Sequence, residues 1–150
     1  MKLLDGRYLY GGFYVIDLSF VHIELMEELK RLEKDAGIYA SALVTNDGFP
    51  LVTAMHNYVD EVIVSASSAS MLALGERTTE EFRHGKLNRI IVEGKDGMTI
   101  INGLNKDLFL ITLAPIDSRL GLLFLEIEET MGRIRKIIKK NKKKIEGDHN

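Results

Sequence analysis

The sequence contains four histidines, and histidine is a common metal ligand and general base. They are His22, His56, His84 and His149. No two of them are four residues apart, and no HExxH-type spacing occurs. Zinc sites and histidine-based catalysis need such spacing to bring the rings together. We therefore expect surface histidines and no metal site.

Serines and glycines are also frequent, and each suggests a chemistry that the sequence does not support. Serines occur at Ser65, Ser67, Ser68 and Ser70, but they fall inside a predicted helix. A nucleophile elbow instead needs GxSxG at a strand-to-helix turn. The 13 glycines include neither GxxxxGK[ST] nor GxGxxG, the phosphate-binding patterns. The sequence thus predicts no enzyme, no bound nucleotide and no other cofactor.

A charged cluster closes the predicted second helix. Glu80, Glu81, Arg83 and His84 lie together at its end. At the exposed end of a helix such residues form solvated charges that add little to stability. The alternative is that they contact a protein partner, since charged and aromatic groups at an exposed position provide specificity.

A second cluster is a basic patch near the C-terminus. Net charge is only -2, but eight cations crowd residues 133–144, so the rest of the chain carries -10. Clustered cations gain from counterion release on anionic lipid or nucleic acid. The alternative is a solvated helix end, whose cations favour the helix dipole. The patch comprises Arg133, Arg135, Lys136, Lys139, Lys140, Lys142, Lys143 and Lys144.

Composition indicates an ordinary globular protein with one core. The chain has 150 residues, 45% hydrophobic and 28% charged, and no cysteine. Disulfides and thiolate metal sites are therefore excluded, and a reducing cytoplasm is the expected compartment. The uncharged stretch 62–75 is too short and too rich in serine to span a bilayer. No signal-peptide layout is seen at the N-terminus.

The elements that would position these residues begin with a hairpin and a helix. Aromatic residues around Gly11 and Gly12 predict a β-hairpin within residues 1–18. Apolar residues at helical spacing then predict a helix over 19–36. The Asp47-Gly48 pair predicts a hairpin between strands at 38–45 and 49–56.

A second helix is predicted over 57–83, with a small-residue stripe that favours close helix packing. Three further strands are predicted at 86–93, 98–103 and 108–114, the last apolar enough to lie at the centre of a sheet. A long final helix starts near Leu120. Together they form an α+β, three-layer α/β/α sandwich with five antiparallel strands, in the order α-β-β-α-β-β-β-α.

This order of elements resembles the Roadblock family, which includes Roadblock-type dynein light chains and MglB proteins. The resemblance covers about residues 21–140 and depends on several short segments in sequence. They are Asp47-Gly48-Phe49-Pro50-Leu51, the serine- and alanine-rich second helix, Val92-Glu93-Gly94 before Asp96-Gly97, Leu108 to Leu113, and Leu120-Gly121-Leu122. The expected domain therefore spans 19–140, between an aromatic extension (1–18) and a C-terminal tail (141–150).

The resemblance implies a non-enzymatic homodimer that regulates or scaffolds a Ras-like small GTPase. In such a dimer the second helices pack together and the third strands pair. The seam residues are then Val62, Ala66, Ala69, Ser70, Ala73, Arg89 and Ile91, and the charged GTPase contacts are Glu76, Arg77, Glu80 and Arg83. The alternative function is a scaffold tethered to anionic membrane or nucleic acid through the basic patch.

Overall fold

The computed structural model describes residues 2–4, 7–10, 13–56 and 59–148, with side-chain surroundings for 21–56 and 59–141. Its helices and strands follow one another as β1 (Lys2–Leu4), β2 (Arg7–Tyr10), β3 (Phe13–Asp17), α1 (Leu18–Ala36), β4 (Ala40–Thr45), β5 (Pro50–Ala54), α2 (Glu61–Glu81), β6 (Arg89–Gly94), β7 (Gly97–Gly103), β8 (Leu108–Ala114) and α3 (Leu120–Asp148).

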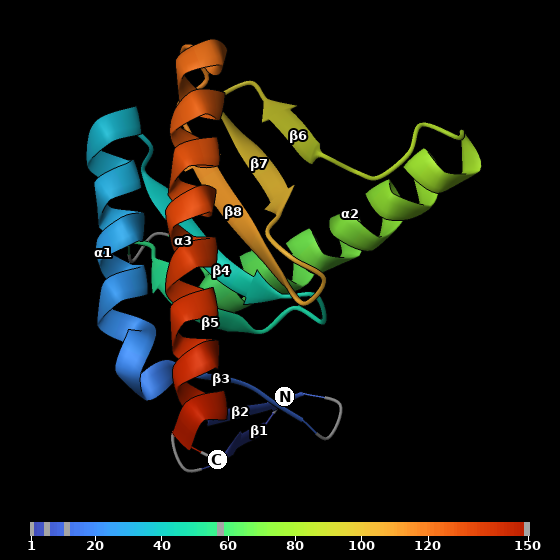
Figure 1. Ribbon diagram of the computed structural model, residues 1–150. Coiled ribbons are helices and arrows are strands. Elements are labelled where there is room, and N and C mark those ends of the chain that lie inside the picture. The colour runs from blue at the N-terminus through green and yellow to red at the C-terminus, as the bar shows by residue number, and fades with distance from the viewer. Residues whose placement is uncertain (1, 5–6, 11–12, 57–58, 149–150) are drawn as a thin grey trace.

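The main sheet has five antiparallel strands in the order β5-β4-β8-β7-β6. Helices α1 and α3 cover one face, and α2 covers the other (Figure 1). This arrangement confirms the predicted α+β sandwich and its element order. Strand β6 lies at one edge of the sheet, so one side of its backbone has no neighbouring strand in the chain.

Strand β8 is the centre of the sheet, and all seven of its residues are buried. Alternate side chains of a strand point to opposite faces. Leu108, Leu110 and Ala114 pack under α1 and α3. Phe109 and Ile111 pack under α2. This is why its sequence is apolar throughout rather than alternating.

A separate three-stranded sheet, in the order β1-β2-β3, precedes the main domain. Strands β2 and β3 pair antiparallel, with Tyr10 opposite Phe13, where the sequence predicts a hairpin. Strand β1 adds a third strand that the sequence analysis does not predict. Strand β3 continues into α1 and contacts α3 (Figure 1).

Some element boundaries differ from the predicted ones for local reasons. Helix α2 begins at Glu61 because the Asp60 carboxylate accepts hydrogen bonds from the amides of Val62 (3.0 Å) and Ile63 (3.2 Å). Positive φ angles at Arg83 (56°) and Gly85 (84°) turn the chain back after α2, so β6 begins only at Arg89. Helix α3 continues to Asp148, through residues predicted as a tail.

Within the described residues, no helix is both long enough and apolar enough to cross a membrane.

Candidate functional site

Helix α2 has two faces with different roles. Its sheet-facing side buries Ser65, Ser68, Ala69 and Leu72. These residues are small apart from Leu72, so the helix axis lies close to the sheet. The β4–β5 turn also packs on it closely, because a Cβ built on Gly48 would lie 3.2 Å from the Ala66 Cα. The predicted serine cluster therefore divides between this packed face and the surface.

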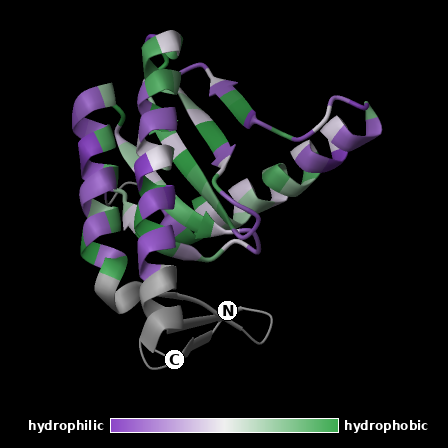
Figure 2. Cartoon of the chain, viewed as in Figure 1, coloured by the Kyte–Doolittle hydropathy of each residue, from purple (hydrophilic) through white to green (hydrophobic). Residues whose placement is uncertain are grey.

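The opposite side of α2 forms an exposed stripe, here named the α2 outer stripe. Its members share one side of the helix at 3.6 residues per turn. Two large apolar residues lie at its start, Val62 (63% exposed) and Ile63 (62%), and Leu74 (64%) lies near its end. Small residues occupy the middle. The stripe consists of Val62, Ile63, Ala66, Ser70, Ala73 and Leu74, and Figure 2 shows α2 pale to green over its first half and purple toward its end.

Four of the five α2 residues predicted for a dimer seam lie on this stripe: Val62, Ala66, Ser70 and Ala73. The fifth does not, because Ala69 is only 9% exposed and packs with the α2-side core of the sheet. Sequence reasoning placed it in the seam because alanine and serine occur on both sides of α2. Ile63 and Leu74 are additional stripe residues. They could have been recognised in the sequence as large apolar residues within a helix of mostly small ones.

Strand β6 provides a second exposed apolar surface beside the stripe. Ile91 is 42% exposed and Val92 is 44% exposed, on opposite faces of this edge strand. Arg89, also predicted at the seam, turns toward α3. Its guanidinium lies 4.2 Å from the centroid of the Phe124 ring and 3.9 Å from a Glu128 carboxylate oxygen. A long exposed edge with apolar side chains is a template for pairing with another chain.

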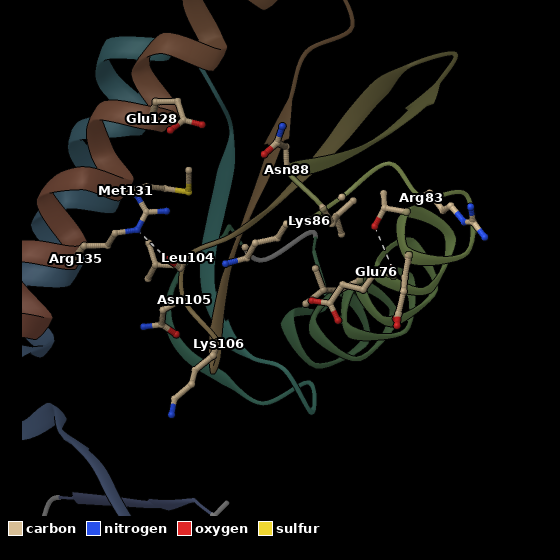
Figure 3. Close-up of a pocket in the computed structure, with 16 residues that line it drawn as sticks. Glu76, Arg83, Lys86, Asn88, Leu104, Asn105, Lys106, Glu128, Met131 and Arg135 are labelled. Atoms are coloured by element: carbon tan, nitrogen blue, oxygen red, sulfur yellow. Dashed lines mark hydrogen bonds between the residues drawn. The ribbon is translucent and has the colours of Figure 1, made fainter.

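A cleft of about 760 Å³ opens between the end of α2, the segment before β6, and α3. Glu76 and Glu80 line its α2 side, and Lys86 and Lys106 lie on its other walls. Arg135 donates a hydrogen bond from Nε to the Leu104 carbonyl oxygen at 2.8 Å. Figure 3 shows charges of both signs around the opening. Mixed charge of this kind suits a polar protein segment better than a simple ion.

The four predicted charged contacts do not share one surface. Glu76, Glu80 and Arg83 line the cleft. Arg77 lies on the other side of α2, where its Nε pairs with Glu81 at 2.9 Å. The end of α2 therefore carries charged side chains on two different sides.

The basic patch is also divided by the fold. Arg133 donates from Nε to the Glu28 carboxylate at 2.7 Å and so ties α3 to α1. Arg135 is bonded to Leu104 as described, whereas Lys136, Lys139 and Lys140 are exposed. The side chains of Lys142, Lys143 and Lys144 lie outside the described residues.

The histidines show no metal-binding arrangement where they are described. His22, His56 and His84 are exposed, and His56 Nε2 lies 3.0 Å from a Glu33 carboxylate oxygen. His149 lies outside the described residues. In the described part of the chain, no three His, Cys, Asp or Glu side chains are grouped so that they could hold a metal ion.

Comparison with known proteins identifies relatives of both sequence and fold. A family model described as "Roadblock/LC7 domain" matches residues 24–114. The uncharacterized protein MJ0310 of Methanocaldococcus jannaschii is 27% identical over 107 residues, which are 71% of this chain and 93% of that protein.

Solved structures support the same fold at low sequence identity. MglB of Myxococcus xanthus superposes with a TM-score of 0.74 and 19% identity, over 78% of this chain and 96% of that one. A structure described as "MglB with tetrameric arrangement" has a TM-score of 0.73 and 13% identity, over 93% and 99%.

Proposed function

Because the chain belongs to the Roadblock/LC7 domain family, we propose that it is a homodimeric adaptor that binds a Ras-like small GTPase. The observation that carries the homodimer is the α2 outer stripe, whose large apolar residues stand at its two ends and small residues at its middle. Such a stripe is complementary to a second copy of itself in antiparallel orientation. Leu74 of one copy would then pack on the small Ala66 of the other, and the copies would cross near Ser70.

The β6 edge supports the same arrangement. Two β6 edges related by a two-fold axis would pair antiparallel and continue the sheet across both copies, covering Ile91 and Val92. A two-fold interface of this type is isologous, with the same patch used on both partners. The tetrameric arrangement reported for one similar MglB structure adds support for self-association in this fold.

The homodimer is tested by the mass in solution. The wild-type chain should behave as a dimer in light scattering. Ala66→Glu should give a folded monomer, because the glutamate would place two like charges at the close crossing of the helices. The matched control is Glu24→Ala, which changes a residue on α1 away from the stripe. A wild-type monomer, or an Ala66→Glu dimer, would refute the proposed seam.

GTPase binding is the finer part of the proposal. We assign Glu76 and Glu80 as its charged contacts because both line the cleft. Arg83 also lines the cleft at the end of α2, whereas Arg77 pairs with Glu81 on the other side of the helix; both stay predictions for the GTPase contact. The dimer would give the GTPase a platform spanning two copies.

Calorimetric titration against each Ras-like GTPase of the source organism, loaded with GDP or a GTP analogue, tests this proposal. We expect one GTPase to bind the wild type, and the double charge reversal Glu76→Lys/Glu80→Lys to weaken binding without changing dimer mass. Glu27→Lys/Glu24→Lys on α1 is the matched control. Binding that survives the α2 reversals would remove the cleft from the contact, and no binding by any GTPase would contradict the adaptor role.

A second candidate function is tethering to an anionic surface, favoured by the exposed Lys136, Lys139 and Lys140. Clustered lysines near a surface attract anionic lipids. Vesicles containing phosphatidylserine should then bind the wild type and lose binding when these three lysines are replaced by glutamine. Equal binding by both chains would exclude the tether.

A further inference from the structure

The end of α2 is closed by a residue in an unfavourable backbone conformation. Arg83 has φ 56°, in the left-handed region, and no other non-glycine residue has positive φ among the described residues. The helix ends with hydrogen bonds from the His84 amide to the Thr79 carbonyl (2.8 Å) and from the Arg83 amide to the Glu80 carbonyl (3.1 Å). Glycine is the usual residue at this position because it has no Cβ to clash. Terminating the helix therefore does not explain an arginine.

The residues around Arg83 form an exposed group, here named the α2 tip: Phe82, Arg83 and His84. Phe82 is 65% exposed, and its ring centroid lies 5.9 Å from that of His84 at a tilt of 50°. Figure 3 shows the Arg83 guanidinium directed outward, away from Lys86 and Leu104. Aromatic residues and arginine are enriched among the side chains that dominate binding energy at protein interfaces. The closed turn holds them in place before any partner arrives.

The position of the tip indicates what it can reach. The C-terminal half of α2 extends past the β6 edge of the sheet, so the tip lies over the space where a second copy would continue that sheet (Figure 1). If two α2 helices cross antiparallel near Ser70, the end of one lies beside the start of the other. The α2 tip would then contact the first turn of α2 in the second copy.

That first turn is complementary to the tip in charge and in polarity. It carries Asp60 and Glu61, followed by the exposed Val62. Phe49, 50% exposed, lies on the β4–β5 turn that packs against α2 at Ala66. Acidic groups beside apolar ones therefore match an arginine beside a phenylalanine.

We propose that the α2 tip is a docking element for a second copy of this chain, in which Arg83 pairs with Glu61 of the second copy and Phe82 packs on Val62 and Phe49 of the second copy. This inference rests on the proposed homodimer. It also explains why an arginine occupies a glycine-like position: the strain in each copy is offset by the contact between copies.

Opposite effects on folding and on association provide the first test. In the monomeric Ala66→Glu background, Arg83→Gly should raise the melting temperature by about 2–4 °C, because the Cβ clash is relieved. In the otherwise wild-type chain the same change should raise the dimer dissociation constant about tenfold, measured by sedimentation equilibrium. Arg83→Asn, which tolerates positive φ but has no charge, should also weaken the dimer.

A charge exchange provides the second test. Arg83→Glu and Glu61→Arg should each weaken self-association, because like charges then meet at both ends of the seam. An equimolar mixture of the two variants should form a heterodimer close to wild type in affinity, since both contacts are again of opposite sign. Thermal melting of each variant controls for the Thr53–Glu61 hydrogen bond (2.7 Å) that Glu61→Arg removes.

The outcomes of these tests distinguish the tip proposal from the homodimer proposal. If Ala66→Glu dissociates the dimer but the Arg83 variants keep the wild-type dissociation constant, the tip proposal is overturned and the homodimer stands. If Ala66→Glu has no effect, the seam itself fails. If the Arg83 variants reduce GTPase binding alone, the tip serves the GTPase, which also overturns docking to a second copy.

Discussion

The two faces of the main sheet are covered in different ways. On one face, α1 and α3 bury large side chains such as Leu29, Ile127 and Ile134 and are tied together by the Arg133–Glu28 ion pair. On the other face, α2 alone covers the sheet, through small residues, and leaves its outer stripe exposed. The first face is arranged for stability. The second has apolar surface left over, which is the property of a surface that binds another protein.

Glutamate substitutions on the two sides of α2 should differ most in their consequences. Ala69→Glu places an unpaired carboxylate against the sheet, and burial without a partner costs several kcal/mol, so unfolding or insolubility is expected. Ala66→Glu, one turn away on the outer stripe, should leave folding intact and remove only self-association. Circular dichroism and light scattering on the pair measure this. Equal stability of the two variants would show that the faces of α2 are assigned wrongly.

The second comparison is between the sheet face that α1 and α3 cover and the α2 outer stripe. Leu29→Ala removes a fully buried side chain of α1 and should lower the free energy of unfolding by about 2–5 kcal/mol. Leu74→Ala changes an exposed side chain and should alter it by less than about 0.5 kcal/mol in the monomeric Ala66→Glu background. Urea titration gives both values. A large loss from Leu74→Ala would mean that this residue packs within one copy.

Alanine substitution at two helical glycines should change the free energy of unfolding by smaller amounts, with opposite signs at the two positions. Gly132→Ala on α3 meets no atom within 4 Å and should stabilise by about 0.5–1 kcal/mol through helix propensity. Gly75→Ala on α2 gains the same propensity, but its Cβ would lie 2.7 Å from Ile90 Cδ1. We expect a net loss of about 0–2 kcal/mol there, since overpacking costs about 1–3 kcal/mol. Stabilisation by both changes would show that the Ile90 side chain can move aside at no cost.

An effect of similar size concerns the cap of α2. Asp60→Ala removes the acceptor for the Val62 and Ile63 amides and should cost about 1 kcal/mol. Asp60→Asn keeps the acceptor and should cost much less. The thermal midpoints of both variants, again in the monomeric background, test the cap alone. A cap that matters for association as well would shift the dimer dissociation constant beyond the change in stability.

Much of the fold could be predicted because the relevant signals are local. The apolar run of β8, the Asp-Gly hairpin turn and the regular apolar spacing of α1 and α3 each depend on neighbouring residues, and all appear as expected. The candidate binding surface is harder to predict from the sequence. Alanine and serine occur on all sides of α2, so hydrophobicity does not distinguish the side that meets the sheet, and the sequence places Ala69 on the wrong side. No local signal reveals that Arg83 adopts a left-handed conformation.

Turn chemistry and hydrophobic periodicity are properties of short segments, so the order of elements, the central strand and the family could be predicted from the sequence. The roles of the charged and small residues depend instead on how the helices pack in three dimensions. Arg133 and Arg135 count as members of a basic patch in the sequence, yet the fold bonds one to Glu28 and the other to the Leu104 carbonyl. Their partners are distant in sequence, and only the packing of α3 against α1 and the sheet brings them within reach.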